Sequence, residues 1–321
     1  MTFHQKISEL KNIIQKELAP LITSDYIFLD LPYFANVGDT LIWQGTLDFL
    51  KTLPYKCLYS SSIENYRNPK ISKEVIILLM GGGNFSDLWY RHQVFRKRIL
   101  QSFPENIIIQ LPQSIYYSDE NILKEDIGVF VQHKHLIMCL RDEQSLDFAN
   151  KYFPNSNNIL VPDMAFYMDL SKWAKYVKPT KNRILFLSRK DSEKKHDQHY
   201  EIVPQEAEVR DWPTMEKRLR LFTVFSIIQR ILRKIDNIVS FNLNNSFSDG
   251  MYKKYFRKYF IMSGISFLSG YSYIYTTRLH VGILSILLGK EFSFFDNSYG
   301  KNKGFYDAWL QNVDTIKFIE S

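Results

Sequence analysis

Residues 273–290 read YIYTTRLHVGILSILLGK, a strand-like run that passes into a helix-like run through an Arg-Leu-His step. Aromatic and β-branched residues predict the strand, and apolar spacing that ends at Gly289 predicts the helix. Arg278 and His280 therefore fall where open α/β sheets bind ligands. Such an arginine can hold a carboxylate or phosphate, and such a histidine can move a proton near neutral pH. The alternative is structural: Arg278 pairs with a carboxylate and His280 caps the helix.

Strand-like runs alternate with amphipathic runs along the chain, which is the pattern of parallel, doubly wound sheets. Besides the run within 273–290, we expect strands at residues 26–31, 55–59, 75–80, 106–111, 135–140, 158–161, 183–188, 238–241 and 291–296. Helices are expected at 213–235, 248–260 and about 305–310. The predicted fold is α/β, with two Rossmann-like domains that face a cleft. They span residues 1–170 and 180–321, and a polar, Lys-rich linker lies at 169–182.

Composition indicates a folded protein with a net positive charge. An apolar fraction of 45% over 321 residues excludes a disordered chain, and a net charge of +7 favours acidic partners without specifying them. Cys57 and Cys139 lie far apart without metal-ligand spacing and are interpreted as buried, reduced thiols of a cytosolic protein. Residues 1–18 lack the apolar core of a signal peptide, and no apolar run is long enough to span a bilayer. We therefore expect a cytoplasmic protein.

Two glycine-containing turns follow predicted strands. In residues 36–40, Gly38 permits a tight turn, the following amides can hold an anion, and Asp39 places a carboxylate at the cleft. The alternative there is an ordinary helix N-cap. In residues 80–89, three successive glycines expose backbone amides to a ligand before a predicted helix, without the pattern of a P-loop or a dinucleotide fingerprint. The alternative for this segment is a tight crossover turn.

Further polar residues follow other predicted strands on the same edge of the sheets. Arg141 and Arg189 would add fixed cations to Arg278. Residues 296–309 form a turn dense in hydrogen-bonding groups, where Lys301 could close over an acidic substrate. Each of these residues could instead belong to a helix cap, a surface ion pair or an ordinary turn.

A basic amphipathic helix is predicted over residues 216–235. Arginines and lysines alternate there with apolar residues, which fits a helix lying on a membrane surface. Packing of its apolar face on the sheet is the favoured interpretation, because most such helices in α/β domains do so.

Several of these segments together resemble a known family. They are Asn36-Val37-Gly38-Asp39, Gly81-Gly82-Gly83-Asn84-Phe85, Leu111-Pro112-Gln113-Ser114, Arg141-Asp142, Pro162-Asp163, Thr277-Arg278-Leu279-His280 and Asp296-Asn297-Ser298-Tyr299-Gly300-Lys301. In this order, over about residues 33 to 310, they resemble the polysaccharide pyruvyl transferase family.

The resemblance implies transfer of a pyruvyl group from phosphoenolpyruvate to two sugar hydroxyls, which forms a ketal and releases phosphate. It also implies a fold like that of GT-B glycosyltransferases, with phosphoenolpyruvate as co-substrate and no cofactor or metal. The acceptor would be a bacterial surface polysaccharide or its lipid-linked precursor, so peripheral contact with the inner face of the cytoplasmic membrane is expected. The first domain would serve the acceptor side and the second domain the donor.

The resemblance also carries over site residues. The family's Arg-Leu-His step, together with an aspartate and an arginine of the first domain, corresponds to Arg278, Leu279, His280, Asp39 and Arg141. Donor-binding residues are expected at Arg278, Leu279, Arg141, Arg189, Gly81, Gly82 and Gly83. Substrate-binding residues are expected at Asn36, Asn84, Gln113, Asn297, Ser298, Tyr299 and Lys301.

The chemistry of the reaction fits these residues. Phosphoenolpyruvate carries a carboxylate and a phosphate, so several arginines are needed to hold it and to stabilise the leaving phosphate. The enol carbon gains a proton while hydroxyls lose protons, so we expect His280 to act as acid or acid/base and Asp39 as base. Arg278 is expected to take part in catalysis as an anion clamp.

Two other functions fit parts of the sequence. A nucleotide-sugar glycosyltransferase could have the same architecture, because fold does not fix function. A non-enzymatic basic module could bind nucleic acid or an anionic membrane, but basic and acidic residues are interspersed and no nucleic-acid motif is present. We therefore expect no nucleic-acid partner.

Overall fold

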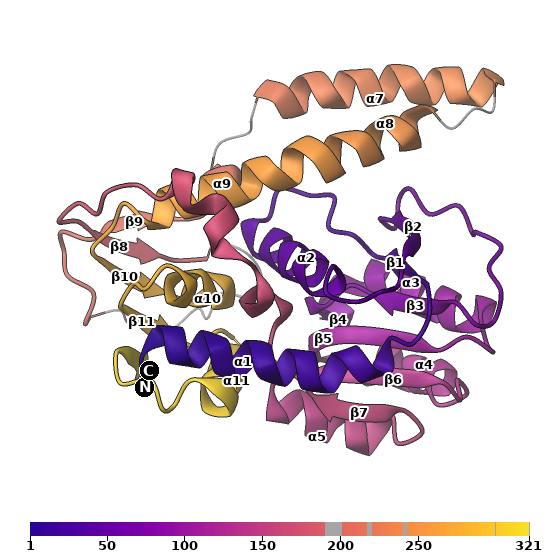
Figure 1. Cartoon of the computed structure of the whole chain (residues 1–321), viewed down its shortest axis with the longest axis horizontal. Helices are drawn as coiled ribbons and strands as arrows, with labels where there is room; N and C mark the ends of the chain where they lie inside the picture. The colour runs from indigo at the N-terminus through magenta and orange to yellow at the C-terminus, as the bar shows by residue number, and fades with distance from the viewer. Residues whose placement is uncertain (190–200, 217–219, 240–242, 299, 321) are drawn as a thin grey trace.

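The computed structural model describes residues 1–189, 201–216, 220–239, 243–298 and 300–320. These residues form two parallel sheets, one in each half of the chain (Figure 1). The first has the strand order β2-β1-β3-β5-β6-β7, with β4 paired to β5, and the second has the order β12-β11-β10-β8-β9. The strands are β1 (Tyr26–Leu29), β2 (Cys57–Ser61), β3 (Ile76–Leu79), β4 (Gly82–Ser86), β5 (Ile108–Tyr116), β6 (Leu136–Leu140), β7 (Asn157–Leu160), β8 (Ile184–Leu187), β9 (Glu208–Arg210), β10 (Tyr273–Thr276), β11 (Phe292–Phe295) and β12 (Ile316–Ile319). The predicted α/β fold with two Rossmann-like parts is confirmed.

Each sheet contains a point where the chain reverses its direction of winding. In the first sheet β1 lies between β2 and β3, and in the second β8 lies between β9 and β10. The connections from the central strand therefore leave toward opposite sides and open a crevice at the carboxyl ends of the strands. The segments that follow β1, β3, β8 and β10 are thus the ones placed to bind a ligand.

Helices surround the two sheets. Those of the first half are α1 (Phe3–Leu18), α2 (Val37–Leu50), α3 (Tyr90–Ser102), α4 (Glu120–Phe130) and α5 (Glu143–Tyr152). Those of the second half are α6 (Pro213–Glu216), α7 (Arg220–Val239), α8 (Leu243–Met251), α9 (Arg257–Leu268), α10 (Leu279–Leu287) and α11 (Lys301–Trp309), with a π-helical turn at Tyr252–Phe256 between α8 and α9. Short 3₁₀ turns lie at Ala19–Leu21, Asp87–Trp89, Met164–Tyr167 and Leu170–Tyr176, the last of them inside the segment expected to be a linker.

Three expectations of local structure are wrong. Residues 238 and 239 continue α7 instead of forming a strand, since a short apolar run does not distinguish the two, and residues 240–241 lie outside the described part. The glycine turn after β3 leads first into β4, because β5 is nine residues long and extends past β3. Cys57 is exposed at the start of β2, an outer strand of the sheet, whereas Cys139 is buried.

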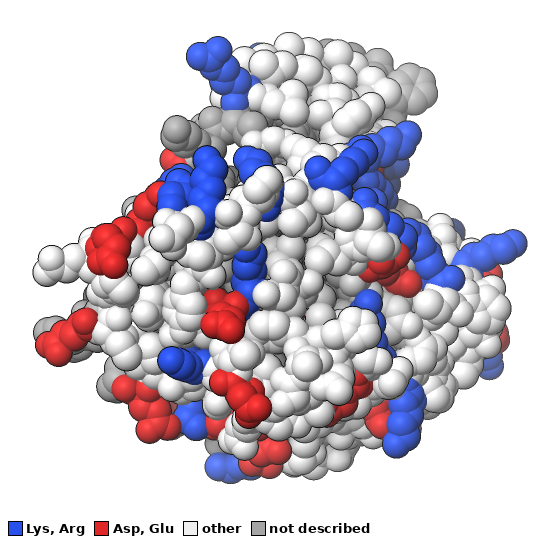
Figure 2. Space-filling view, turned by 60° about the vertical axis from the view of Figure 1, so that its left-hand side comes forward, with Lys and Arg blue, Asp and Glu red and all other residues white. Residues whose placement is uncertain are grey.

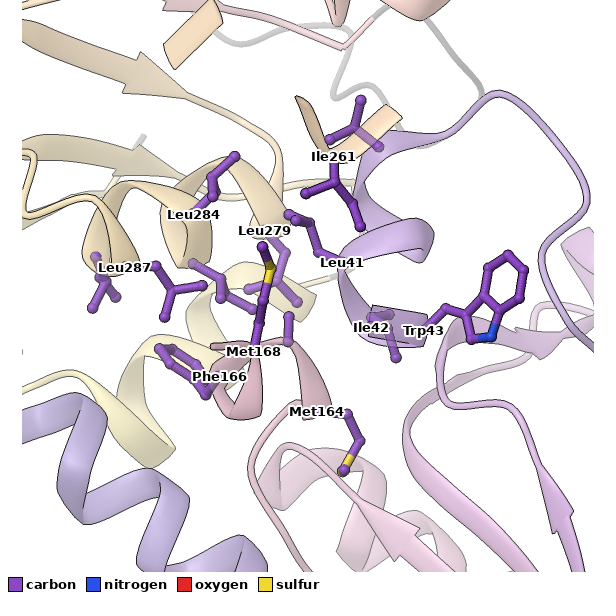
Figure 3. Close-up of a cluster of buried hydrophobic side chains, with 14 of the residues drawn as sticks. Leu41, Ile42, Trp43, Met164, Phe166, Met168, Ile261, Leu279, Leu284 and Leu287 are labelled. Atoms are coloured by element: carbon purple, nitrogen blue, oxygen red, sulfur yellow. The ribbon is translucent and has the colours of Figure 1, made fainter. Parts of the chain in front are cut away.

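One continuous apolar core joins the two halves (Figure 3). Leu41 of α2, Met164 and Phe166 of the 3₁₀ turn after β7, Ile261 of α9 and Leu284 of α10 pack together in it. Helix α1 also contributes buried residues to this core and contacts α10. The crevice between the sheets therefore has a packed floor that fixes its geometry. Among the residues described, no helix combines the length and apolarity needed to cross a bilayer.

Candidate active site

A cavity of about 840 Å³ lies between the two halves of the chain, at the carboxyl ends of the strands. This volume lies within the range of small-molecule binding sites. From the first half it is lined by Phe34, Ala35, Asn36, Gly38, Asp39, Gly83, Asn84, Trp89, Arg91, His92 and Arg141. From the second half it is lined by Arg189, Asp211, Trp212, Met215, Glu216, Arg278, Leu279, His280 and Lys301.

His280 lies in the first turn of α10, directly against the first turn of α2. A Cβ atom on Gly38 would be 2.7 Å from His280 Nδ1, so the ring can occupy this place only because residue 38 is glycine. On its other side, His280 Nε2 lies 3.3 Å from Asp163 Oδ2. Arg278, not His280, is the N-terminal cap residue of α10, and its side chain makes no capping bond. The imidazole is therefore held between two elements and not used to cap the helix.

Asp163 is fully buried and connects His280 to Arg141. Arg141 donates from Nη1 to Asp163 Oδ2 at 2.5 Å and from Nε to Ser114 Oγ at 2.9 Å. Burial alone would raise the pKa of Asp163, but the charges of His280 and Arg141, with hydrogen bonds from His280 and the Ala165 amide, lower that pKa well below its ordinary value. Asp163 therefore stays ionised and can orient the His280 ring.

Asp39 lies in the first turn of α2, beside His280. Asn36 is the cap residue of this helix, accepting from the Gly38 amide at 2.9 Å, and it donates from Nδ2 to Asp39 Oδ2 at 2.5 Å. Desolvation raises the pKa of Asp39, while the charges of His280, Arg141, His92 and Lys301 oppose the rise. A carboxyl group with a raised pKa among these groups is suited to proton transfer.

Arg278 forms a bidentate ion pair with Asp211. Its Nε and Nη2 atoms donate to the two carboxylate oxygens of Asp211, each at 2.7 Å, and Nη2 also lies 3.5 Å from Met215 Sδ. Both charged side chains are buried and both line the cavity. The carboxylate pairing expected as the alternative for Arg278 is thus observed. Asp211 fixes the orientation of the guanidinium group at the cavity wall.

Two cations lie close against the backbone at Gly83. A Cβ atom at this position would lie 3.1 Å from Arg141 Nη2 and 3.3 Å from Lys301 Nζ. The two cations come from opposite halves of the chain, because Arg141 follows β6 and Lys301 begins α11. The absence of a side chain at residue 83 therefore lets the two cations meet at the cavity wall, where their charges suit an anionic group.

A second buried carboxylate holds a second imidazole. Asp30 follows β1 with a φ of +65°, a conformation that is rare for a residue other than glycine, and such strain often occurs at functional sites. Its Oδ1 and Oδ2 lie 2.8 and 3.0 Å from His92 Nδ1. Asn84 Nδ2 lies 3.0 Å from the same nitrogen, and His92 lines the cavity. The first half of the chain therefore supplies its own Asp–His pair.

Ten of the residues expected from the sequence line the cavity. They are Asn36, Asp39, Gly83, Asn84, Arg141, Arg189, Arg278, Leu279, His280 and Lys301.

The other expected residues that the structure describes lie behind the cavity wall or beyond it. Gln113 is buried and donates from Nε2 to Asn84 Oδ1 at 2.6 Å, and Asn297 Oδ1 accepts from the Lys301 amide at 2.8 Å. Each therefore positions a residue that does line the cavity. Gly81, Gly82 and Ser298 do not line it, and Tyr299 lies outside the described residues. Gly81 is packed against β5, where a Cβ atom would lie 2.5 Å from the Pro112 oxygen.

Comparison with known proteins gives the family. Residues 36–299 match the sequence profile of the polysaccharide pyruvyl transferase family, and the chain belongs to that family. It is 31% identical over its full length to EpsO, a candidate pyruvyl transferase of Bacillus subtilis strain 168, and covers 94% of that protein. It is 26% identical to pyruvyl transferase 1 of Schizosaccharomyces pombe over 297 residues, covering 88% of this chain and 69% of the yeast protein.

A solved structure shares the fold. The crystal structure of a functionally uncharacterised Klebsiella pneumoniae protein is 25% identical, with a TM-score of 0.61, and the match covers 98% of each chain. The resemblance inferred from the sequence motifs is thereby confirmed at the level of family and fold.

Proposed function

We propose that this protein transfers a pyruvyl group from phosphoenolpyruvate to two hydroxyls of a sugar in a bacterial surface polysaccharide or its lipid-linked precursor. The product is a pyruvate ketal, and phosphate is released. The observation that carries the proposal is the meeting of Arg141, Arg189, Arg278 and Lys301 in one cavity with His280. A small donor with a carboxylate and a phosphate requires such a concentration of cations.

The donor is placed near the second half of the chain in this proposal. Arg278, held by Asp211, and Arg189 would bind the carboxylate and phosphate, and Arg141 with Lys301, which meet beside Gly83, would bind an anionic oxygen. As the C–O bond to phosphate breaks, these cations would stabilise the negative charge on the leaving group. Lysine at position 278 could not reproduce the two bonds to Asp211.

Proton transfers are assigned to groups that border the same cavity. The methylene carbon of phosphoenolpyruvate gains one proton and becomes a methyl group, and His280, oriented by Asp163, would supply it. The two acceptor hydroxyls each lose a proton as their oxygens bond to C2, and the departing phosphate carries away the proton in excess. Asp39 and His92, which both line the cavity, are the groups placed to accept the hydroxyl protons.

The test uses phosphoenolpyruvate labelled with ¹³C at C2, incubated with a panel of glycosides that carry neighbouring hydroxyl pairs. Carbon NMR should show a quaternary ketal carbon, and phosphate should appear in equal amount. His280→Ala should bind the donor and keep its fold but give no product. Sugar transfer from a nucleotide sugar, with phosphoenolpyruvate left intact by every acceptor, would contradict the proposal and favour the glycosyltransferase alternative.

A further inference from the structure

Helix α7 projects from the body of the protein and packs along α8 (Figure 1). The face that it turns toward the body is aromatic. Phe222 stacks on Phe256 with 4.4 Å between ring centroids, and Phe225 contacts Phe247 and Tyr252. One face of this helix therefore packs on α8 and the π-helical turn after it, where the sequence favoured packing on a sheet.

A second apolar row runs along a different side of the same helix. It consists of Leu221, Val224, Ile227, Ile231 and Ile235, with 38–53% of each residue exposed. Steps of three and four residues place all five on one side, and the row extends about 21 Å at a rise of 1.5 Å per residue. Single exposed apolar residues are common on protein surfaces, but a continuous exposed apolar row is typical of an interaction surface.

The charge of the helix restricts what can cover this row. Over residues 220–236 it carries Arg220, Arg230, Arg233 and Lys234 against one acidic residue, Asp236. Asp236 accepts hydrogen bonds from the backbone amides of residues 243 and 244, at the start of α8. In Figure 2 the lobe at the top is largely white, and Lys and Arg side chains gather around its base.

Among candidate partners, an anionic lipid surface matches both features. A second copy of this chain matches less well, because two α7 helices packed against each other would bring like charges together. We propose that α7 docks the protein on an anionic membrane, with the apolar row at the boundary between headgroups and acyl chains and with Arg220, Arg230 and Lys234, which lie on or beside the same side of the helix, on lipid phosphates. The chain would lie on the bilayer without crossing it.

The position of α7 connects this surface to the cavity. Met215 and Glu216 of α6 line the cavity, and α7 begins four residues after Glu216. A docked α7 would thus hold the cavity close to the lipid surface, where a lipid-linked acceptor would be found. The docking itself does not depend on the reaction, and only this last consequence rests on the proposed function.

Vesicle flotation of the full chain tests the docking. The protein should float with vesicles of phosphatidylcholine mixed with phosphatidylglycerol, but not with phosphatidylcholine alone. Ile227→Ser with Ile231→Ser should weaken binding more than about tenfold, because two apolar side chains no longer enter the bilayer. Arg230→Gln with Lys234→Gln should weaken it by roughly fivefold for each charge removed.

Matched controls separate docking from folding and from catalysis. Val94→Ser removes an apolar side chain of similar exposure on α3, and Lys124→Gln removes an exposed charge on α4, so both should bind vesicles like the wild type. All variants should keep the wild-type unfolding midpoint and the wild-type affinity for phosphoenolpyruvate. If the α7 variants lose vesicle binding but still bind phosphoenolpyruvate, the loss comes from the surface of α7 and not from unfolding or from damage to the cavity.

Three results would overturn the inference. They are failure of the wild type to float with anionic vesicles, equal flotation of the Ile227→Ser/Ile231→Ser variant, and a concentration-dependent dimer that this variant abolishes in the absence of vesicle binding. The last result would assign the row to a second copy of the chain.

Discussion

Replacing Gly38 by alanine should displace His280 without unfolding the protein. The added Cβ atom would lie 2.7 Å from His280 Nδ1, 2.9 Å from Cγ and 3.0 Å from Cβ. Atoms of this kind normally approach to about 3.5 Å, so the ring must move by roughly 0.5–1 Å. That movement also disturbs the contact of 3.3 Å between His280 Nε2 and Asp163.

The expected cost is kinetic. A misplacement of about 1 Å in a reacting group can lower the rate by about 10²-fold. Stability should change little, because alanine is up to about 1 kcal/mol more favourable than glycine in a helix and offsets part of the local strain. We therefore expect phosphate release to fall about a hundredfold in Gly38→Ala, with donor affinity and the unfolding midpoint near wild-type values.

The matched control is Gly128→Ala. Gly128 lies in α4, and no atom lies within 4 Å of the position its Cβ would take. This variant should gain up to about 1 kcal/mol of stability and keep full activity. Full activity in Gly38→Ala would refute the placement of His280 at the reacting centre, and an equal loss in both variants would show that the loss does not come from contact with His280.

Three further changes test the charged groups. Arg278→Ala should lower the free energy of unfolding in urea by about 3–5 kcal/mol, because it leaves Asp211 buried without its partner. Adding Asp211→Asn to this variant should restore stability but not activity. An unchanged urea midpoint in the single variant would contradict this prediction. Asp39→Asn should raise the thermal midpoint at neutral pH and abolish turnover, since the raised pKa of Asp39 means that its charged form is disfavoured in the fold. Asp163→Asn should be less stable than the wild type at neutral pH. Because the folded pKa of Asp163 lies below its unfolded value of about 3.9, the difference in unfolding free energy should shrink as pH falls below about 4, and a constant difference would count against the assignment.

The strand ends were the part of the site that the sequence could predict. Arg141, Arg189 and Arg278 each follow an apolar run, and parallel strands bring their carboxyl ends to one edge of a sheet. The three successive glycines predicted that the backbone lies close to other groups. Gly81 does so against β5, and Gly83 does so against Arg141 and Lys301. The sequence did not predict strand β4, which begins within the glycine run and precedes α3. This strand forms because β5 extends beyond β3 and so offers a free edge for pairing.

Partners that are distant in the chain could not be predicted. Asp211 and Arg278 are 67 residues apart, and Asp30 and His92 are 62 residues apart, with no local spacing that links either pair. Asp30 stood at the end of a predicted strand, but its left-handed backbone conformation and its pairing with His92 come from tertiary structure. The sequence also did not predict which apolar residues of α7 are exposed. Apolar periodicity marks a helix as amphipathic, but it does not show whether all of its apolar residues pack inside the protein or whether a second row stays exposed.

Calorimetric titration tests the central claim about the donor most directly. Phosphoenolpyruvate and a panel of nucleotide sugars should each be titrated into the wild type and into Arg189→Ala, with and without the glycoside panel. We expect phosphoenolpyruvate to bind, the nucleotide sugars not to bind, and Arg189→Ala to lose at least about tenfold in affinity, as for a charged hydrogen-bonding partner. Binding of a nucleotide sugar, with none of phosphoenolpyruvate even when acceptors are present, would contradict the account.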